Sequence, residues 1–204
     1  YQIKADQSQR ISDLLFTTVF EGKASFEELA RNIGIAIPFF AQAGIAIEDF
    51  FAATATLSQG GIRTNIIMTA LRGVISQVIK PMDGSLRVAK ALGIEFTTTA
   101  IAARGLGNWL KDLAEKTQLN QNYIAALFPD VRGLLAVLAL YGKQSDTMIR
   151  ITREMYENTG ITDLAFQRYT NTLDRQWGIL SNRVIPAFIK LGDVIVGPVT
   201  KALT

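Results

Sequence analysis

The chain has 204 residues, of which 49% are hydrophobic and 19% are charged, so it can bury a core and is not disordered. Its net charge of +3 is too small to predict binding to duplex DNA, and we expect no sequence-specific nucleic acid binding. It contains no cysteine and no histidine, which excludes disulfides, thiolate metal sites, the common zinc ligand sets and histidine-based triads. We therefore expect no cofactor, no metal site and no enzyme.

Hydrophobic residues recur at helical spacing along the chain, and the alternation typical of strands is nearly absent, which predicts an all-α fold. The first apolar face runs from Ile11 to Val19 and is followed by Gly22 as a stop. Ser25 and Glu28 have the spacing of a capping box, so a helix is predicted to begin at Ser25. Further helices are predicted around residues 67–79, ended by Pro81, and at 106–113, 121–128, 131–141, 145–158 and 163–195.

The dipeptide Gly-Ile occurs at residues 34–35, 44–45, 61–62, 93–94 and 160–161. A helix that ends in a Schellman motif needs a residue with positive φ, usually glycine, followed by an apolar residue that packs back on the last turn. We expect positive φ at the helix-capping glycines Gly44, Gly61, Gly93 and Gly160. These tight corners predict that residues 1–160 form a bundle of short helices.

Residues 161–204 are predicted to form a separate long helix with a narrow heptad seam. Pro186 should kink or split this helix. One interpretation is that the helix packs on its own domain, and the other is that copies associate along the seam, with a trimer favoured and a hexamer compatible. The candidate seam residues are Leu173, Trp177, Leu180, Val184, Leu191 and Val194.

Between Asn32 and Ile62 the only charged residues are Glu48 and Asp49. A helix of a soluble domain normally has a polar face, which this stretch lacks, so we expect contact either with neighbouring copies or with a membrane. Pro38 and Gly44 divide the stretch into pieces that are too short to span a bilayer. The candidate contact residues are Ile35, Ile37, Phe39, Phe40, Ile47, Phe50 and Phe51.

The motifs that resemble catalytic or cofactor sites are incomplete. The carboxylates of Glu48 and Asp49 are sequence neighbours, which point to different parts of a helix surface and do not converge on one reacting atom. They are expected in a first helical turn, where negative charge suits the helix dipole. The sequence from Gly105 to Gly107 begins like a dinucleotide loop but lacks the third glycine and a preceding strand.

An ordered set of short motifs resembles the core region of phage tail tape-measure proteins, and the likeness extends over nearly the whole chain. No single motif is specific, and the order carries the resemblance. One departure is that Ala46 stands where a Ser or Thr cap is usual. The motifs are Ser25 to Ala30 (SFEELA), Ile37-Pro38, Gln42 to Ile45 (QAGI), Glu48 to Leu57 (EDFFAATATL) and Thr69 to Gly73 (TALRG).

The resemblance implies a structural virion protein that is one section of a longer chain. Copies of such a chain lie in the tail tube lumen or at the tail tip, set tail length during assembly in the host cytoplasm, and take part in genome ejection. The implied partners are further copies, tail tube proteins and tail-tip or baseplate proteins.

Two other functions remain open from the sequence. One is a membrane-active helical module that inserts into the host membrane during ejection, which liposome binding would reveal. The other is a soluble helical enzyme that uses a carboxylate base, which a strongly raised carboxyl pKa in a closed cleft would favour.

Overall fold

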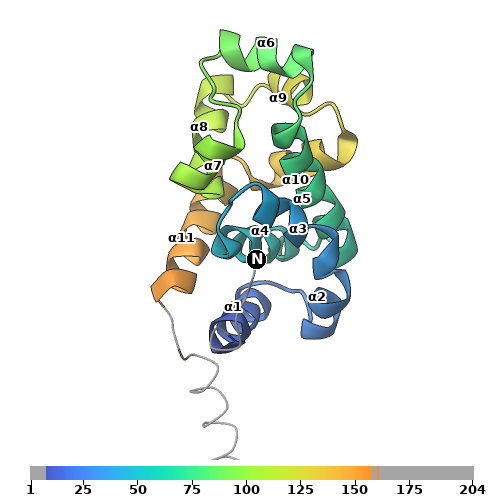
Figure 1. The fold of residues 1–204 in the computed structure, drawn as a ribbon, viewed down its shortest axis with the longest axis vertical. Coiled ribbons are helices and arrows are strands. Elements are labelled where there is room, and N and C mark those ends of the chain that lie inside the picture. The colour runs from blue at the N-terminus through green and yellow to red at the C-terminus, as the bar shows by residue number, and fades with distance from the viewer. Residues whose placement is uncertain (1–7, 158–159, 161–204) are drawn as a thin grey trace, which may run out of the picture. The chain divides into compact units, whose positions relative to one another are not determined.

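The computed structural model describes residues 8–157 and Gly160. The chain divides into two units, Tyr1–Gly160 and Ile161–Thr204, and only the first is described below. The described residues form eleven α-helices and one short 3-10 helix, without a strand, which confirms the all-α class (Figure 1). In chain order they are α1 (Ser8–Glu21), α2 (Phe26–Asn32), the 3-10 helix η2 (Ile33–Ile35), α3 (Ile37–Gln42), α4 (Ile47–Gln59), α5 (Thr64–Ile79), α6 (Asp83–Ala91), α7 (Thr98–Arg104), α8 (Leu106–Thr117), α9 (Gln121–Leu127), α10 (Val131–Leu140) and α11 (Lys143–Glu157).

Local signals set most helix ends. The Ser25 hydroxyl accepts a hydrogen bond from the Glu28 backbone N–H, and the Ser25 N–H donates to the Glu28 carboxylate, both at 3.2 Å. This is the capping box that the sequence predicts. Helix α5 ends two residues before Pro81, which cannot continue a helix. Helix α4 begins after Ala46 without a side-chain cap, as the departure from the usual Ser or Thr indicates.

Helix α4 is the centre of the fold. It contacts α1, α3, α5, α8, α10 and α11, and all of its residues from Glu48 to Ser58 are buried. Figure 1 shows α1 and α2 at one end of this unit and α6 and α9 at the other, with α4 between them. The hydroxyls of Thr54 and Thr56 donate to carbonyls one turn earlier at 2.8 Å, so they are buried without losing a hydrogen bond.

The burial of α4 corrects one expectation from the sequence. Phe40, Phe50 and Phe51 are at most 1% exposed and pack edge to face in the core of their own domain. These three rings are therefore not available at the surface for a second copy or a lipid. Ile35, Ile37, Phe39 and Ile47 are partly buried and pack against the same core. Helix α4 lacks a polar face because neighbouring helices cover it on all sides.

The helix-capping glycines have the left-handed backbone that the Gly-Ile dipeptides indicate. Their φ angles are +69° at Gly44, +78° at Gly61, +65° at Gly93 and +82° at Gly160. After α3 and α6 the full Schellman pattern is present, with Ile45 N–H donating to Phe40 O and Ile94 N–H donating to Ala89 O. The first Gly-Ile pair differs, because Gly34 lies inside η2.

Helices α5 and α10 cross closely at two glycines. A Cβ atom added to Gly73 would lie 3.0 Å from the Gly133 backbone nitrogen, and one added to Gly133 would lie 3.2 Å from the Gly73 carbonyl carbon. The Cβ atom at Gly73 would also lie 3.0 Å from a carboxylate oxygen of Asp130. The Gly133 and Gly73 atoms belong to backbone, so they cannot move aside as a flexible side chain would. The absence of side chains at both positions is therefore what allows the two helices to approach.

We predict that Gly73→Leu lowers the free energy of unfolding by about 1–3 kcal/mol, the usual cost of overpacking, although leucine is the better helix former. Gly84→Leu in α6 is the matched control, because a Cβ atom there meets nothing within 4 Å. Urea titrations monitored by circular dichroism give both values. Equal stability of the two variants would contradict the role assigned to the crossing.

Candidate functional site

The buried carboxylates of Glu48 and Asp49 form the one strongly polar cluster in the centre of the described fold. They lie in the first turn of α4 and are only 3% and 4% exposed. Arg10 of α1 donates to the Glu48 carboxylate from both Nε and Nη2, the Nε bond being 3.1 Å long. The Leu106 N–H at the start of α8 donates to Asp49. The cluster therefore connects α1, α4 and α8.

Tyr156 brings α11 to the same cluster. Its hydroxyl is hydrogen-bonded to Glu48 and is influenced by the charge of Asp49. Burial of the hydroxyl, and after it the charges of both carboxylates, raise the pKa of Tyr156. The phenol therefore stays protonated at physiological pH and can donate. Four helices meet at two adjacent side chains that the sequence alone placed on a helix surface.

The carboxyl of Asp49 has a raised pKa. Burial, followed by the charge of Glu48, raises it from 3.8 to about 6, while the hydrogen bond from the Leu106 N–H acts in the opposite direction. Among the described residues, Arg10 pairs with Glu48 and no ion pair reaches Asp49. The charge of Asp49 is therefore stabilised chiefly by the start of α8.

A cavity of about 440 Å³ lies beside Asp49, between α4, α7, α8 and α11. Arg104, Asn108 and Thr152 are among its lining residues. The Arg104 Nε and Thr152 Oγ1 atoms are buried and have no hydrogen-bond partner in the described part of the chain. The cavity thus combines a carboxyl of raised pKa with polar groups. This observation favours the alternative of an enzyme that uses a carboxylate base.

The surroundings of Asp49 also account for its pKa without catalysis. Gly105, the N-cap residue of α8, has φ of +80°, and a Cβ atom there would lie 3.5 Å from both carboxylate oxygens. The side chain is thus packed against the start of α8, where it accepts the Leu106 N–H. Arg104, one of the two arginines that line the cavity, is already paired with Glu95 and Asp112. The arrangement is that of a buried helix cap.

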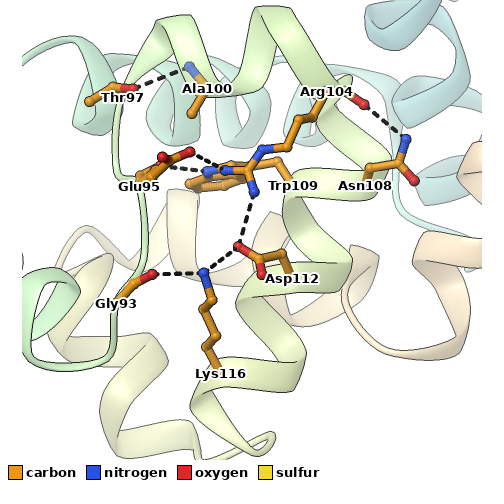
Figure 2. Close-up of polar contacts among 9 residues, drawn as sticks. All are labelled: Gly93, Glu95, Thr97, Ala100, Arg104, Asn108, Trp109, Asp112 and Lys116. Carbon is orange, nitrogen blue, oxygen red and sulfur yellow. Dashed lines mark hydrogen bonds and ion pairs between the residues drawn. The ribbon is translucent and has the colours of Figure 1, made fainter.

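Figure 2 shows a second polar network, which fixes the segment between α6 and α7 to α8. Arg104 contacts Glu95 at 3.0 Å and Asp112 at 3.3 Å, and Lys116 contacts Asp112 at 3.0 Å and the Gly93 carbonyl at 2.7 Å. The Trp109 indole N–H donates to the Glu95 carbonyl at 2.9 Å. The corner at Gly93 is thus fixed by the hydrogen bond from Lys116 to its carbonyl as well as by its left-handed backbone.

The other predicted site residues fall into two groups. The candidate seam residues Leu173, Trp177, Leu180, Val184, Leu191 and Val194 lie outside the described residues. The large apolar side chains on the surface are not the candidate contact residues that the sequence predicts. They include Phe20, Phe26, Met82, Leu119, Val131 and Tyr156, each more than half exposed.

Metal binding and membrane crossing are two further possibilities for the residues that the structure describes. No group of three acidic side chains there is arranged to hold a metal ion. None of the described helices has both the length and the apolar character that crossing a membrane requires.

The fold and the cluster define an all-α domain whose central helix is held by buried polar contacts. The family model for phage-related minor tail proteins matches residues 1–128, and the chain belongs to that family. It is therefore a phage tail protein, and it is related to tape-measure proteins. The match ends one residue after α9, so it covers the central helix and most of its neighbours.

Two curated relatives are tape-measure proteins. The chain is 21% identical over 169 residues to the probable tape measure protein of Escherichia phage P2, covering 79% of this chain and 21% of that protein. It is 22% identical over 96 residues to the tape measure protein of Pneumococcus phage Dp-1, covering 47% of this chain and 8% of that protein. The chain thus spans about a fifth of the length of the first relative and less than a tenth of the second. No solved structure matches it.

We predict that Asp49→Asn raises the free energy of unfolding at pH 7.5, because it removes a buried charge and keeps an oxygen that accepts the Leu106 N–H. The pKa of Asp49 is about 6 in the folded chain and 3.8 as the ordinary value, so as the pH falls the folded chain binds a proton at Asp49 before the unfolded chain does. Protonation of Asp49 should therefore raise the free energy of unfolding between pH 7 and pH 4, by up to about 3 kcal/mol.

Urea titrations at several pH values measure the difference between Asp49→Asn and the parent chain. That difference should be largest at pH 7.5 and shrink toward pH 4.5. Glu115→Gln is the control, because Glu115 is exposed on α8. A difference that does not change with pH would show that Asp49 does not titrate in this range.

Proposed function

We propose that this chain is a structural section of a phage tail tape-measure protein, located in the tail tube lumen or at the tail tip. The observation that carries the proposal is the family match together with the likeness to two tape-measure proteins. Its partners would be further copies of itself, tail tube proteins and tail-tip or baseplate proteins. Its contribution would be to tail assembly, tail length and genome ejection.

The chemistry of the described residues supports a role by contact. Polar groups of the core join helices, since Glu48 binds Arg10 and Asp49 binds the start of α8. On the surface, Arg150 of α11 binds Glu21 of α1 at 2.8 Å. Groups engaged in this way hold the fold and leave the exposed surface to meet partners. This favours a virion component over the two alternatives from other classes.

The membrane alternative has lost the observation that suggested it, since the apolar stretch forms the core of its own domain. The enzyme alternative retains the raised pKa of Asp49 beside a cavity. Asp49→Asn also distinguishes these functions, because a tail component should keep its function in that variant whereas an enzyme with this base should not.

The proposal is tested in the phage that encodes this chain. In-frame removal of residues 8–157 from the parent gene should give particles with shortened tails or no tails in negative-stain micrographs. Cryo-electron microscopy of intact wild-type particles should show helical density for this section in the tube or at the tip. Tails of normal length and normal infectivity without the section would contradict a structural role.

We further propose that copies associate along residues 170–194, and we favour a trimer, since identical chains on a tail axis usually adopt closed rotational symmetry. Trp177→Glu combined with Leu180→Glu places two charges on the predicted seam and should reduce the oligomeric mass in light scattering. Asn182→Glu, at an outward heptad position, is the matched control and should leave the mass unchanged. An unchanged mass in the double variant would refute the seam.

A further inference from the structure

A groove of about 450 Å³ lies beside the crossing of α5 and α10. It exposes three large apolar side chains, Val131 at 74%, Leu135 at 41% and Ile66 at 38%. Two arginines, Arg72 and Arg132, also line it, and no carboxylate does. The complete lining is Asn65, Ile66, Thr69, Ala70, Arg72, Val131, Arg132 and Leu135.

The residues at the start of α10 are poor choices for an isolated domain. Val131 and Arg132 occupy its first turn, which contains no acidic residue. A cation there opposes the helix dipole, and an exposed β-branched side chain gains nothing from burial. Within the described residues no ion pair involves Arg132. The N-cap residue Asp130 compensates the helix dipole, since its carboxylate accepts the Gly133 N–H at 3.2 Å. The exposed side chain of Val131 has no such compensation, which is typical of a side chain that serves a partner.

The chain also presents a surface of the opposite character on α2. Phe26 is the first residue of that helix and is 58% exposed. Glu27 and Glu28 follow it directly. The Glu27 side chain is 73% exposed and pairs with Arg31 of the same helix, an exposed ion pair of the kind that contributes little and can be exchanged for another. We call Phe26 with these two carboxylates the acidic knob, and the cavity between α5 and α10 the basic groove. The acidic knob has an aromatic side chain next to two carboxylates, and the basic groove has apolar side chains next to two arginines.

We propose that the acidic knob of one copy docks into the basic groove of a second copy. The aromatic ring would cover Ile66 and Leu135, and Glu27 would face Arg132. The proposal rests on the association of copies proposed above and adds a second, separate contact to it. Since knob and groove are different patches, the contact is either exchanged within a two-fold pair or repeated around a ring.

The size of the contact sets the conditions under which it forms. One aromatic knob and its rim cover much less than the roughly 800 Å² per partner of a stable interface. The contact is therefore weak between free chains, and it forms where another association holds copies at an effective concentration on the order of millimolar. A test has to report proximity between the two surfaces as well as total mass.

Cross-linking between single cysteines provides that test, because the chain has no cysteine of its own. Ala30→Cys places a thiol one turn after Phe26, and Asn65→Cys places one on the groove wall; both positions are exposed. Mixing the two full-length variants with a short bismaleimide should give a cross-linked heterodimer. Pairing Ala30→Cys with Ala91→Cys, exposed on α6, is the control and should give no such product.

Charge reversal then tests the complementarity. Arg132→Glu in the Asn65→Cys chain should abolish the heterodimer, and Glu27→Arg in the Ala30→Cys chain should restore it. Arg132→Glu puts an acid in a first helical turn, which favours folding, and circular dichroism checks that both variants fold. A product that survives Arg132→Glu, or one equally strong with Ala91→Cys, overturns the proposal.

Light scattering of the wild-type chain separates this proposal from the one on which it rests. If the chain is oligomeric, loses mass in the Trp177→Glu and Leu180→Glu variant, and still gives no knob-to-groove product, the docking proposal is wrong and the association along residues 170–194 stands. If the wild-type chain remains monomeric at all concentrations and gives no product, both are wrong.

Discussion

The fold depends on the burial of α4 on every side. A fully buried helix gains apolar packing along its whole length, but each polar group it carries must find a partner inside the protein. Helix α4 meets this constraint in two ways. Its hydroxyls donate to carbonyls of the same helix, as Thr54 and Thr56 do, and its two carboxylates lie at the N-terminal end, where other helices reach them.

Burying two carboxylates costs free energy, but at the start of α4 they form hydrogen bonds that join neighbouring helices. Glu48 and Asp49 sit where the dipole of α4 favours negative charge, and each is approached from a different helix. Arg10 brings α1 to Glu48, the Leu106 N–H brings α8 to Asp49, and Tyr156 brings α11 to both. Because Asp49 has no cation of its own among the described residues, the burial of its charge outweighs the hydrogen bond from the Leu106 N–H. The folded domain is therefore more stable when that carboxyl is protonated, and its free energy of unfolding depends on pH.

Local structure could be read from the sequence, and packing could not. The capping box at Ser25, the stop before Pro81 and the corners at Gly44 and Gly93 depend on a few consecutive residues. The helices α6 and α7 were not predicted as such, because their apolar faces are short.

The burial of Glu48 and Asp49 was missed for another reason: sequence spacing shows how a helix face is composed but not how many neighbours cover it. The apolar stretch was correctly judged unusual, and its cause lies in contacts from helices as distant in sequence as α10 and α11.

The same distinction explains why the exposed surface was not foreseen. An apolar residue in a helical stripe predicts core, and most stripes of this chain are core, including Trp109 and Phe128. Phe26 and Val131 fall outside the stripes, each as the first residue of its helix, where the side chain projects beyond the packed face. Since the core is complete without them, their size and hydrophobicity contribute nothing to the described domain. The domain leaves an aromatic ring and a valine in water, and these are the side chains that the proposed contact between copies would cover.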